Sequence, residues 1–325
     1  MKTKTCVALT GVACALGLVF SSAVLAQAYP SKTVRIIVPY PAGGGNDIIA
    51  RMVAQRLTDT LGQQFIVENR PGAGGSIGMD AVAKSTPDGH TLLVAPNNLA
   101  IVPALFAKIP FDPIKDFAPV IGIVNSPGMV AVHSAVSAKT FQELVALVKA
   151  QPGKLNYTSC GTASPQHLAG ELMKSMVGLD MQHVPYAGCA PSVTDAAAGR
   201  VEIIIGTVGN IMPHHKAGRL RALVTTGAKR SDVAPEFPTV AESGVPGYEA
   251  DVWFAMFAPA KTPRDAVMRL NGEINKLLSA TDFRERLRTL NFEPRGGTPE
   301  DLGKTVANDL ARWGKVVRDV GIKAE

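Results

Sequence analysis

The chain has 325 residues, of which 46% are hydrophobic and 18% are charged. This length and composition predict a globular protein with two domains or one large domain, and they exclude a disordered tail or a coiled coil. The formal net charge of +6 comes from dispersed basic residues, with no run of five or more Lys and Arg, which argues against a nucleic-acid partner and suits small anions.

Residues 1–28 have the three regions of a secretory signal peptide. Lys2 and Lys4 precede an apolar stretch at residues 6–20, and small residues follow up to an A-x-A cleavage pattern that ends at Ala28. The apolar stretch is shorter than the roughly 20 residues of a membrane-spanning helix, so cleavage is favoured over anchoring. We therefore expect an exported, soluble protein.

Two cysteines, Cys160 and Cys189, follow this segment. They are too few for a disulfide framework, and a single bridge between them stays open because the sequence does not supply the Cα distance that a bridge requires. No C-x-x-C or H-E-x-x-H pattern occurs, and the adjacent His214 and His215 would diverge on a helix or strand. We predict no metal site.

Short runs rich in Val and Ile alternate with helical patterns along the chain, which predicts an α/β protein built on parallel sheets. The clearest strand-like runs are residues 34–38, 65–67, 91–94, 201–205 and 222–225.

Three helices have readable starts. Thr140 with Glu143 predicts a capping box, and Thr-Pro pairs at residues 262–263 and 298–299 predict two later helices. The last of these helices carries Trp313 on its apolar face, which predicts a core side chain and not a platform for a ligand.

The strongest candidate binding site is the loop after the first strand. Residues 39–47 read Pro-Tyr-Pro-Ala-Gly-Gly-Gly-Asn-Asp and lead into a helix, so backbone N–H groups and the positive end of the helix dipole are available to an anion. Neither G-x-x-x-x-G-K-[ST] nor G-x-G-x-x-G is present, which favours a carboxylate over a phosphate cofactor. The alternative is a tight turn capped by Asp47.

A second candidate is the hydroxyl-rich segment at residues 157–167. Ser164 is the expected N-cap of the following helix, and His167 lies in its first turn. The hydroxyls of Thr162 and Ser164 are candidate donors to a carboxylate, and capping alone is the alternative. Residues 183–191 lead into another helix start and form a weaker third candidate.

Side chains elsewhere add to the predicted pocket. Asn97 and Asn98 follow a strand, where the carboxyl end of a sheet opens into a crevice, although a turn would also explain them. Trp253 and Phe254 are candidate pocket walls, with core packing as the alternative.

An exported hydrolase is the alternative function. Ser76 lies in a G-x-S-x-G pattern, but several residues separate it from its preceding strand, unlike a nucleophile elbow. Cys160 with His167 is a candidate Cys/His pair that lacks a recognisable third residue. Turnover of an ester would identify either nucleophile.

Proline-containing joints at residues 125–128 and 244–247 bracket a central segment. If both joints are crossovers, the chain leaves a first domain, builds a second and returns. We therefore predict one domain from residues 29–128 and 248–325 and another from residues 129–247. A cleft between two such domains is a common location for a small ligand.

These motifs together resemble the Bug family, the periplasmic solute-binding receptors of tripartite tricarboxylate transporters. The resemblance covers the mature chain and implies a Venus flytrap of the periplasmic-binding-protein type II kind, with two α/β domains that close on a small carboxylate. It rests on the signal peptide and on residues 29–30, 38–47, 68–75, 87–91, 161–167, 183–186 and 238–244.

The resemblance also implies a periplasmic protein without enzymatic activity or cofactor, which delivers its ligand to membrane permease subunits. We expect a monomer, and a sensor that presents its ligand to a signalling partner is a further alternative. The predicted ligand-binding set comprises Tyr40, Ala42, Gly43, Gly44, Asp47, Asn97, Asn98, Ser159, Cys160, Thr162, Ser164, His167, Tyr186 and Trp253.

The chain departs from the family pattern at three positions. Cys160 and Cys189 stand where the family usually has small residues such as Ser or Gly, and Ala187 stands where Lys is frequent. Loss of a cation there weakens the case for a citrate-like ligand. Beside di- and tricarboxylates, we therefore consider an aromatic carboxylate such as terephthalate.

Overall fold

The computed structural model describes residues 29–106, 108–162 and 164–321. The expected signal peptide lies outside the described residues. Among the described residues, none of the helices combines the length and apolar character that a membrane span requires.

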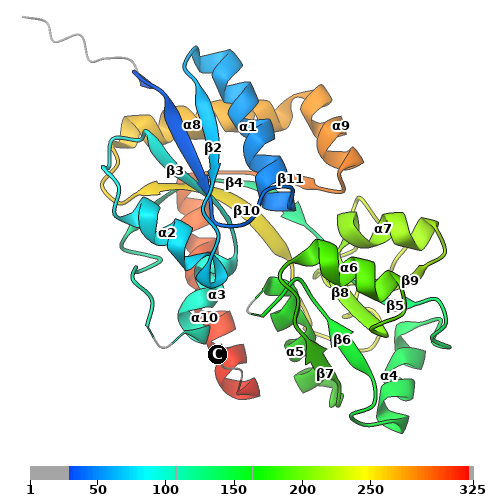
Figure 1. The fold of residues 1–325 in the computed structure, drawn as a ribbon. Helices are drawn as coiled ribbons and strands as arrows, with labels where there is room; N and C mark the ends of the chain where they lie inside the picture. Colours follow the sequence, from blue (N-terminus) through cyan, green and yellow to red (C-terminus); the bar gives the residue numbers. More distant parts are fainter. Residues whose placement is uncertain (1–28, 107, 163, 322–325) are drawn as a thin grey trace, which may run out of the picture.

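Two β-sheets organise the chain, and the first has six strands (Figure 1). β1 pairs in parallel with both of its neighbours, whereas β10 runs antiparallel between β3 and β4. In sheet order the strands are β11 (Glu293–Gly296), β4 (Phe117–Ser126), β10 (Val252–Pro259), β3 (Thr91–Pro96), β1 (Val34–Val38) and β2 (Phe65–Asn69).

The second sheet has five strands. β6 pairs in parallel with β7 and β8, and β5 runs antiparallel between β8 and β9. In sheet order the strands are β7 (Gln182–Val184), β6 (Asn156–Thr158), β8 (Ile203–Thr207), β5 (Gly128–His133) and β9 (Leu220–Thr225).

The prediction of parallel sheets is therefore wrong in part, because both sheets are mixed. The chain crosses from the first sheet to the second between β4 and β5, and it returns between β9 and β10. A helical crossover within one sheet forces parallel strands, whereas strands joined through these crossings are free to run antiparallel.

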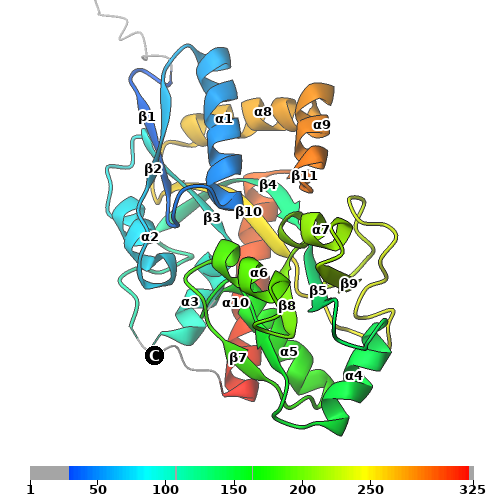
Figure 2. The ribbon, with the colours of Figure 1, turned by 45° about the vertical axis from the view of Figure 1, so that its right-hand side comes forward.

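Helices pack against both sheets, and the first residues of α1 lie at the side of the first sheet nearest α6 and α7 (Figures 1 and 2). The helices are α1 (Gly45–Leu61), the short 3₁₀ helix η1 (Ala73–Gly75), α2 (Ser76–Ala83), α3 (Asn98–Leu105), α4 (Phe141–Ala150), α5 (Pro165–Val177), α6 (Cys189–Ala197), α7 (Val208–Lys216), α8 (Arg264–Ser279), α9 (Thr281–Thr289) and α10 (Pro299–Val320).

The predicted helix starts are confirmed to within a residue: α8 begins at Arg264, directly after the Thr-Pro pair, with Pro263 as its N-cap and no side-chain cap. Thr298 and Asp301 form a complete capping box at α10. At α4 the Thr140 hydroxyl accepts from the Glu143 N–H, but the Glu143 carboxylate accepts from the Lys139 N–H instead of that of Thr140. Both side chains of the predicted box therefore still accept hydrogen bonds from backbone N–H groups at the start of α4.

The last helix contributes to two hydrophobic cores. Leu302 and Val306, near its beginning, pack with Phe257 of the first sheet. Trp313, which is only 1% exposed, packs near its end with side chains of the second sheet such as Tyr157. Trp313 is thus a core residue, as predicted, and α10 ties the two sheets together in addition to the strand crossings.

Candidate functional site

The glycine-rich turn before α1 is open at its tip. Ala42, Gly43 and Gly44 are exposed, and no side chain of the described residues caps the first turn of α1 at Gly44. Gly43 has a φ of +86°, a left-handed conformation that favours glycine. The turn therefore presents backbone, with the positive end of a 17-residue helix behind it.

The Asp47 side chain joins this turn to α1 and to the end of β2 through hydrogen bonds. Its carboxylate accepts hydrogen bonds from Gly43 N at 2.9 Å, Arg51 Nε at 3.0 Å and Asn69 Nδ2 at 3.0 Å. Burial would raise the pKa of Asp47, but these bonds outweigh it and lower the pKa below its ordinary value. The alternative of a turn held by Asp47 is thus present, since its carboxylate accepts from Gly43 of the turn, from Arg51 of α1 and from Asn69 at the end of β2.

Tyr40 and Asn69 hold the other side of the turn. The Asn69 side chain donates to the Tyr40 carbonyl oxygen at 3.0 Å, and the Tyr40 hydroxyl donates to the Gly74 carbonyl oxygen at 3.0 Å. Sequence reasoning did not single out Asn69. Its position at the carboxyl end of β2, beside the end of β1, was the available signal.

Buried amides lie at the carboxyl end of β3. Asn97 donates through Nδ2 to the Asp251 carbonyl oxygen, and Asn46 donates through Nδ2 to the Val94 carbonyl oxygen. The Oδ1 atoms of Asn97 and Asn46 are buried and have no hydrogen-bond partner in the described part of the chain. Asn98, at the start of α3, is also buried. Asn46 was missed because it lies inside a turn whose glycines carry the sequence signal.

Aromatic side chains lie against the beginning of α1. Phe254 and Phe292 meet edge to face with ring centroids 5.9 Å apart, and a Cβ atom on Gly45 would lie 3.2 Å from the Phe292 ring. Trp253 points elsewhere: it is 4% exposed, and its Nε1 donates to Asp309. Core packing, the alternative considered for Trp253, is what the structure contains.

On the second sheet, the predicted hydroxyl cluster forms at the start of α5. Ser164 caps α5 by accepting from the His167 N–H at 3.1 Å, and Ser159 Oγ lies 2.8 Å from His183 Nε2. The hydroxyls of Ser159 and Ser164 are 3.5 Å apart. Thr162 is exposed at the tip of the same loop.

Beneath these hydroxyls two histidines stack, with the ring centroids of His167 and His183 4.0 Å apart. Burial, opposed in part by Glu171, lowers the pKa of His167. Burial, then His167 and Lys174, lowers that of His183 to about 3. The imidazole of His183 is therefore neutral at pH 7. Sequence reasoning placed His183 only in the weaker third segment.

Cations near these loops are paired with carboxylates. Lys174 Nζ lies 2.8 Å from Glu171, whose carboxylate also accepts from the Tyr157 hydroxyl. Arg200 pairs with Asp195, which accepts the Tyr186 hydroxyl at 2.8 Å. On the first sheet, Arg51 pairs with Asp47. The available donors are therefore mainly backbone N–H groups, hydroxyls and imidazoles.

Cys160 and Cys189 form a disulfide, which answers the question that the sequence left open. A disulfide sulfur is not a thiolate, so Cys160 as a nucleophile beside His167 is wrong for this state. Ser76 is buried at the first position of α2, with 7% of its surface exposed. Ser159 does contact His183, but in this structure it is fully buried, which also argues against the predicted direct contact of Ser159 with a ligand.

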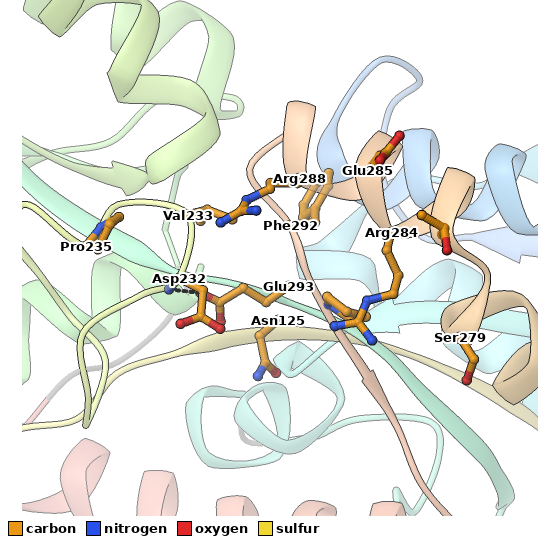
Figure 3. A pocket seen from close by; sticks show the side chains of 12 residues that line it. Asn125, Asp232, Val233, Pro235, Ser279, Arg284, Glu285, Arg288, Phe292 and Glu293 are labelled. Carbon is orange, nitrogen blue, oxygen red and sulfur yellow. Dashed lines mark hydrogen bonds between the residues drawn. The ribbon is translucent and has the colours of Figure 1, made fainter.

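A cavity of about 840 Å³ lies between α9 and residues 232–235 (Figure 3), and Phe292, which also lies beside Gly45, is among its lining residues. None of the predicted ligand-binding residues lines it. Its polar side chains include Arg284 and Arg288 but also the carboxylates of Asp232 and Glu293. Those carboxylates would repel an anionic ligand, so the cavity fits a small carboxylate less well than the turn before α1.

Comparisons with known proteins agree with this fold. A family model described as "Tripartite tricarboxylate transporter family receptor" matches residues 49–322. The chain is 35% identical to Protein BugT of Bordetella pertussis over 92% of this chain and 93% of that protein. It is also similar to the solved structure of R. palustris Rpa4515 with adipate (36% identity, TM-score 0.85, 91% and 99% coverage). A further similar structure is MatC of Rhodopseudomonas palustris with bound malate (31% identity, TM-score 0.80, 89% and 100% coverage).

Proposed function

The chain belongs to the tripartite tricarboxylate transporter family of receptors, and from that membership we propose that it is an extracytoplasmic receptor for a small carboxylate. The solved structures named above, with adipate and with malate, support carboxylates as the ligand class. The observation in this chain that carries the proposal is the exposed backbone of the turn at Gly43 and Gly44, which lies at the start of α1, has no side-chain cap at Gly44, and is held by the hydrogen bond from Gly43 N to Asp47.

The ligand is held between two domains, formed by residues 29–128 with 248–325 and by residues 129–247. The presence of two sheets, with strand crossings near residues 127 and 226–251, supports this division. A carboxylate at the turn before α1 bridges to donors on the second domain and stabilises the closed form by its greater affinity for that form. The protein acts by binding and release, without covalent chemistry.

On the second domain the ligand meets the loop of Thr162 and Ser164, with His167 behind it. This half of the site is neutral, because the cations nearby are paired and the pKa values of both stacked histidines are lowered. The edge-to-face pair of Phe254 and Phe292 adds an apolar wall beside Gly45. A ligand of low charge with an apolar body, such as an aromatic carboxylate or an aliphatic dicarboxylate, fits these groups better than citrate does.

Delivery completes the proposed role. The receptor is exported through its signal peptide, works in the periplasm as a monomer and passes the ligand to membrane permease subunits. The family description, which names a transporter receptor, supports this destination. An uptake assay distinguishes this role from that of a sensor that presents the ligand to a signalling partner. Cells that lack the receptor gene lose uptake of the ligand only if the receptor serves transport.

A thermal-shift screen of the mature protein tests ligand capture. The panel contains adipate, malate, citrate, benzoate, terephthalate and amino acids, and each acid that stabilises the protein is recovered and checked for chemical change. An acid present at 100 times its Kd adds about 2.7 kcal/mol to the free energy of unfolding. We expect one or more carboxylates to raise the melting temperature and to return intact.

A matched pair of variants locates the site. Gly43 and Gly62 lie before and after α1, both with positive φ and with open space where a Cβ atom would stand. Gly43→Ala and Gly62→Ala therefore carry a similar backbone cost, but only Gly43→Ala should weaken ligand binding. Equal weakening by both would place the effect in the helix as a whole. If no acid shifts the melt, or an acid returns cleaved, the receptor role is refuted.

A further inference from the structure

We propose that the Cys160–Cys189 disulfide is the positioning element of the second-domain half of the ligand site. The inference rests on the proposed function and adds a role for two side chains. Apart from His167 in α5, the predicted ligand residues on this side come from two separate segments: residues 159–162 and 164 before α5, and residues 185–189, which lead into α6 at Cys189. The disulfide joins these segments, which lie 29 positions apart at the bonded residues.

The strand ladder below the disulfide stops short of these segments. β6 and β7 pair up to Thr158 and Val184, where the Thr158 hydroxyl donates to the Val184 carbonyl oxygen at 3.0 Å. Beyond that point, no hydrogen bond links the described residues 160–162 and 164 with residues 185–189. The disulfide is thus the covalent tie where hydrogen bonding ends.

The two segments are in direct contact beside the disulfide. A Cβ atom on Gly161 would lie 2.5 Å from the Tyr186 carbonyl oxygen, and the φ of Gly161 is +117°. The Tyr186 hydroxyl bonds to Asp195 within α6 and so does not hold the segments together. Close packing at Gly161 defines one relative placement, and the disulfide retains it.

A fixed placement matters because the first segment carries the hydroxyls of Thr162 and Ser164, and the second presents the start of α6 at Gly188, which has no side-chain cap. Without the disulfide, the entropy lost in ordering both segments would reduce the free energy of ligand binding. Cys160 and Cys189 are partly exposed, so a soluble dithiol can reach them. Thiol–disulfide exchange then breaks the S–S bond, forms two S–H bonds on the protein and oxidises the dithiol to its own disulfide.

The test compares the wild-type protein with the Cys160→Ser/Cys189→Ser double variant. Hydrogen exchange is measured over residues 160–162 and 185–190. The internal control is α4, a helix whose buried side chains pack in the core of the second sheet. Affinity for adipate and for terephthalate is measured by calorimetry. We expect exchange to rise at least tenfold in the two segments but not in α4, binding of whichever acid the wild type binds to weaken at least tenfold, and the melt to stay cooperative.

Reduction of the wild type with dithiothreitol should reproduce these changes, and reoxidation of the same sample should reverse them, which covers the case in which the double variant fails to fold. Faster exchange throughout α4 would mean that the disulfide stabilises the whole domain, and it would overturn the positioning role. Unchanged exchange in the two segments, or an affinity within twofold of the wild type, would also overturn it. If the wild type binds neither acid, affinity is compared for the acid that the thermal-shift screen identifies; if no acid binds, the proposed function fails, and the exchange measurement still decides whether the disulfide orders the segments.

Discussion

Replacing Asp47 by Asn should destabilise the turn before α1 through lost charge and not through lost volume. In the wild type the carboxylate accepts from Gly43 N, from Asn69 Nδ2 and from the Arg51 guanidinium. An Asn side chain keeps one acceptor oxygen but turns an amide donor toward the donors of Asn69 and Arg51. One charge-assisted hydrogen bond contributes about 1.5–3 kcal/mol, and the half-exposed Arg51 pair adds at most about 1 kcal/mol. We expect Asp47→Asn to lower the free energy of unfolding by about 2–3 kcal/mol at pH 7.

The pH dependence separates charge from packing. The pKa of Asp47 is lower in the folded protein than in the unfolded chain, so its contribution is fully present above the unfolded pKa of about 3.9. The contribution is lost as the pH falls through the folded pKa. The difference between wild type and Asp47→Asn should therefore be largest above about pH 5 and shrink toward pH 2.

Urea unfolding at pH 7 and at low pH measures this difference. Asp59→Asn is the matched control, since Asp59 is an exposed residue of the same helix that accepts one hydrogen bond from Gln55. It should change the free energy of unfolding by less than about 0.5 kcal/mol. A deficit of Asp47→Asn that is the same at both pH values, or no larger than that of Asp59→Asn, would refute the argument.

Three further predictions concern stability. Trp313→Ala should cost about 3–5 kcal/mol in urea unfolding, whereas Trp313→Phe should cost less than half of that, since the indole N–H has no partner in the described ranges; equal losses would contradict this. Gly161→Ala should cost about 2 kcal/mol more than Gly178→Ala in the same assay, because both have positive φ but only Gly161 faces a backbone oxygen; equal losses in the free energy of unfolding would rule out the contact. Burial lowers the pKa of His183 to about 3, so the free energy of unfolding should fall by about 2 kcal/mol from pH 7 to pH 5 as the unfolded histidine, with a pKa near 6.5, takes up a proton. His183→Gln should show a smaller fall, and an imidazole NMR signal of His183 that titrates near pH 6.5 would disprove the premise.

The strands that the sequence predicts are those with concentrated Val and Ile, such as β1 and β8. β10 was not predicted, although all eight of its residues are buried. A strand buried on both faces lacks the alternation that identifies strands, and periodicity alone does not separate it from a buried helix. β6 and β7 have three residues each, too few for a pattern to emerge.

In the candidate site, the features that depend on neighbouring residues were predicted and those that depend on distant residues were not. The turn at Gly43 and the cap at Ser164 were predicted, because each depends on a few neighbouring residues. Asn69 and Phe292 were missed, because each reaches the turn before α1 from a distant part of the chain. The amide of Asn69 and the ring of Phe292 carry no local sign of that contact.

By itself, the sequence determined the α/β character, the helix starts and the open glycine turn, since hydrogen bonding and backbone conformation at these places are decided within about one helical turn. Only the tertiary structure decided that Cys160 pairs with Cys189, that His167 stacks on His183 and that Trp253 belongs to the core. Each of those outcomes depends on the distance between side chains far apart in the chain. That distance follows from the packing of the two sheets and their helices, which no local pattern encodes.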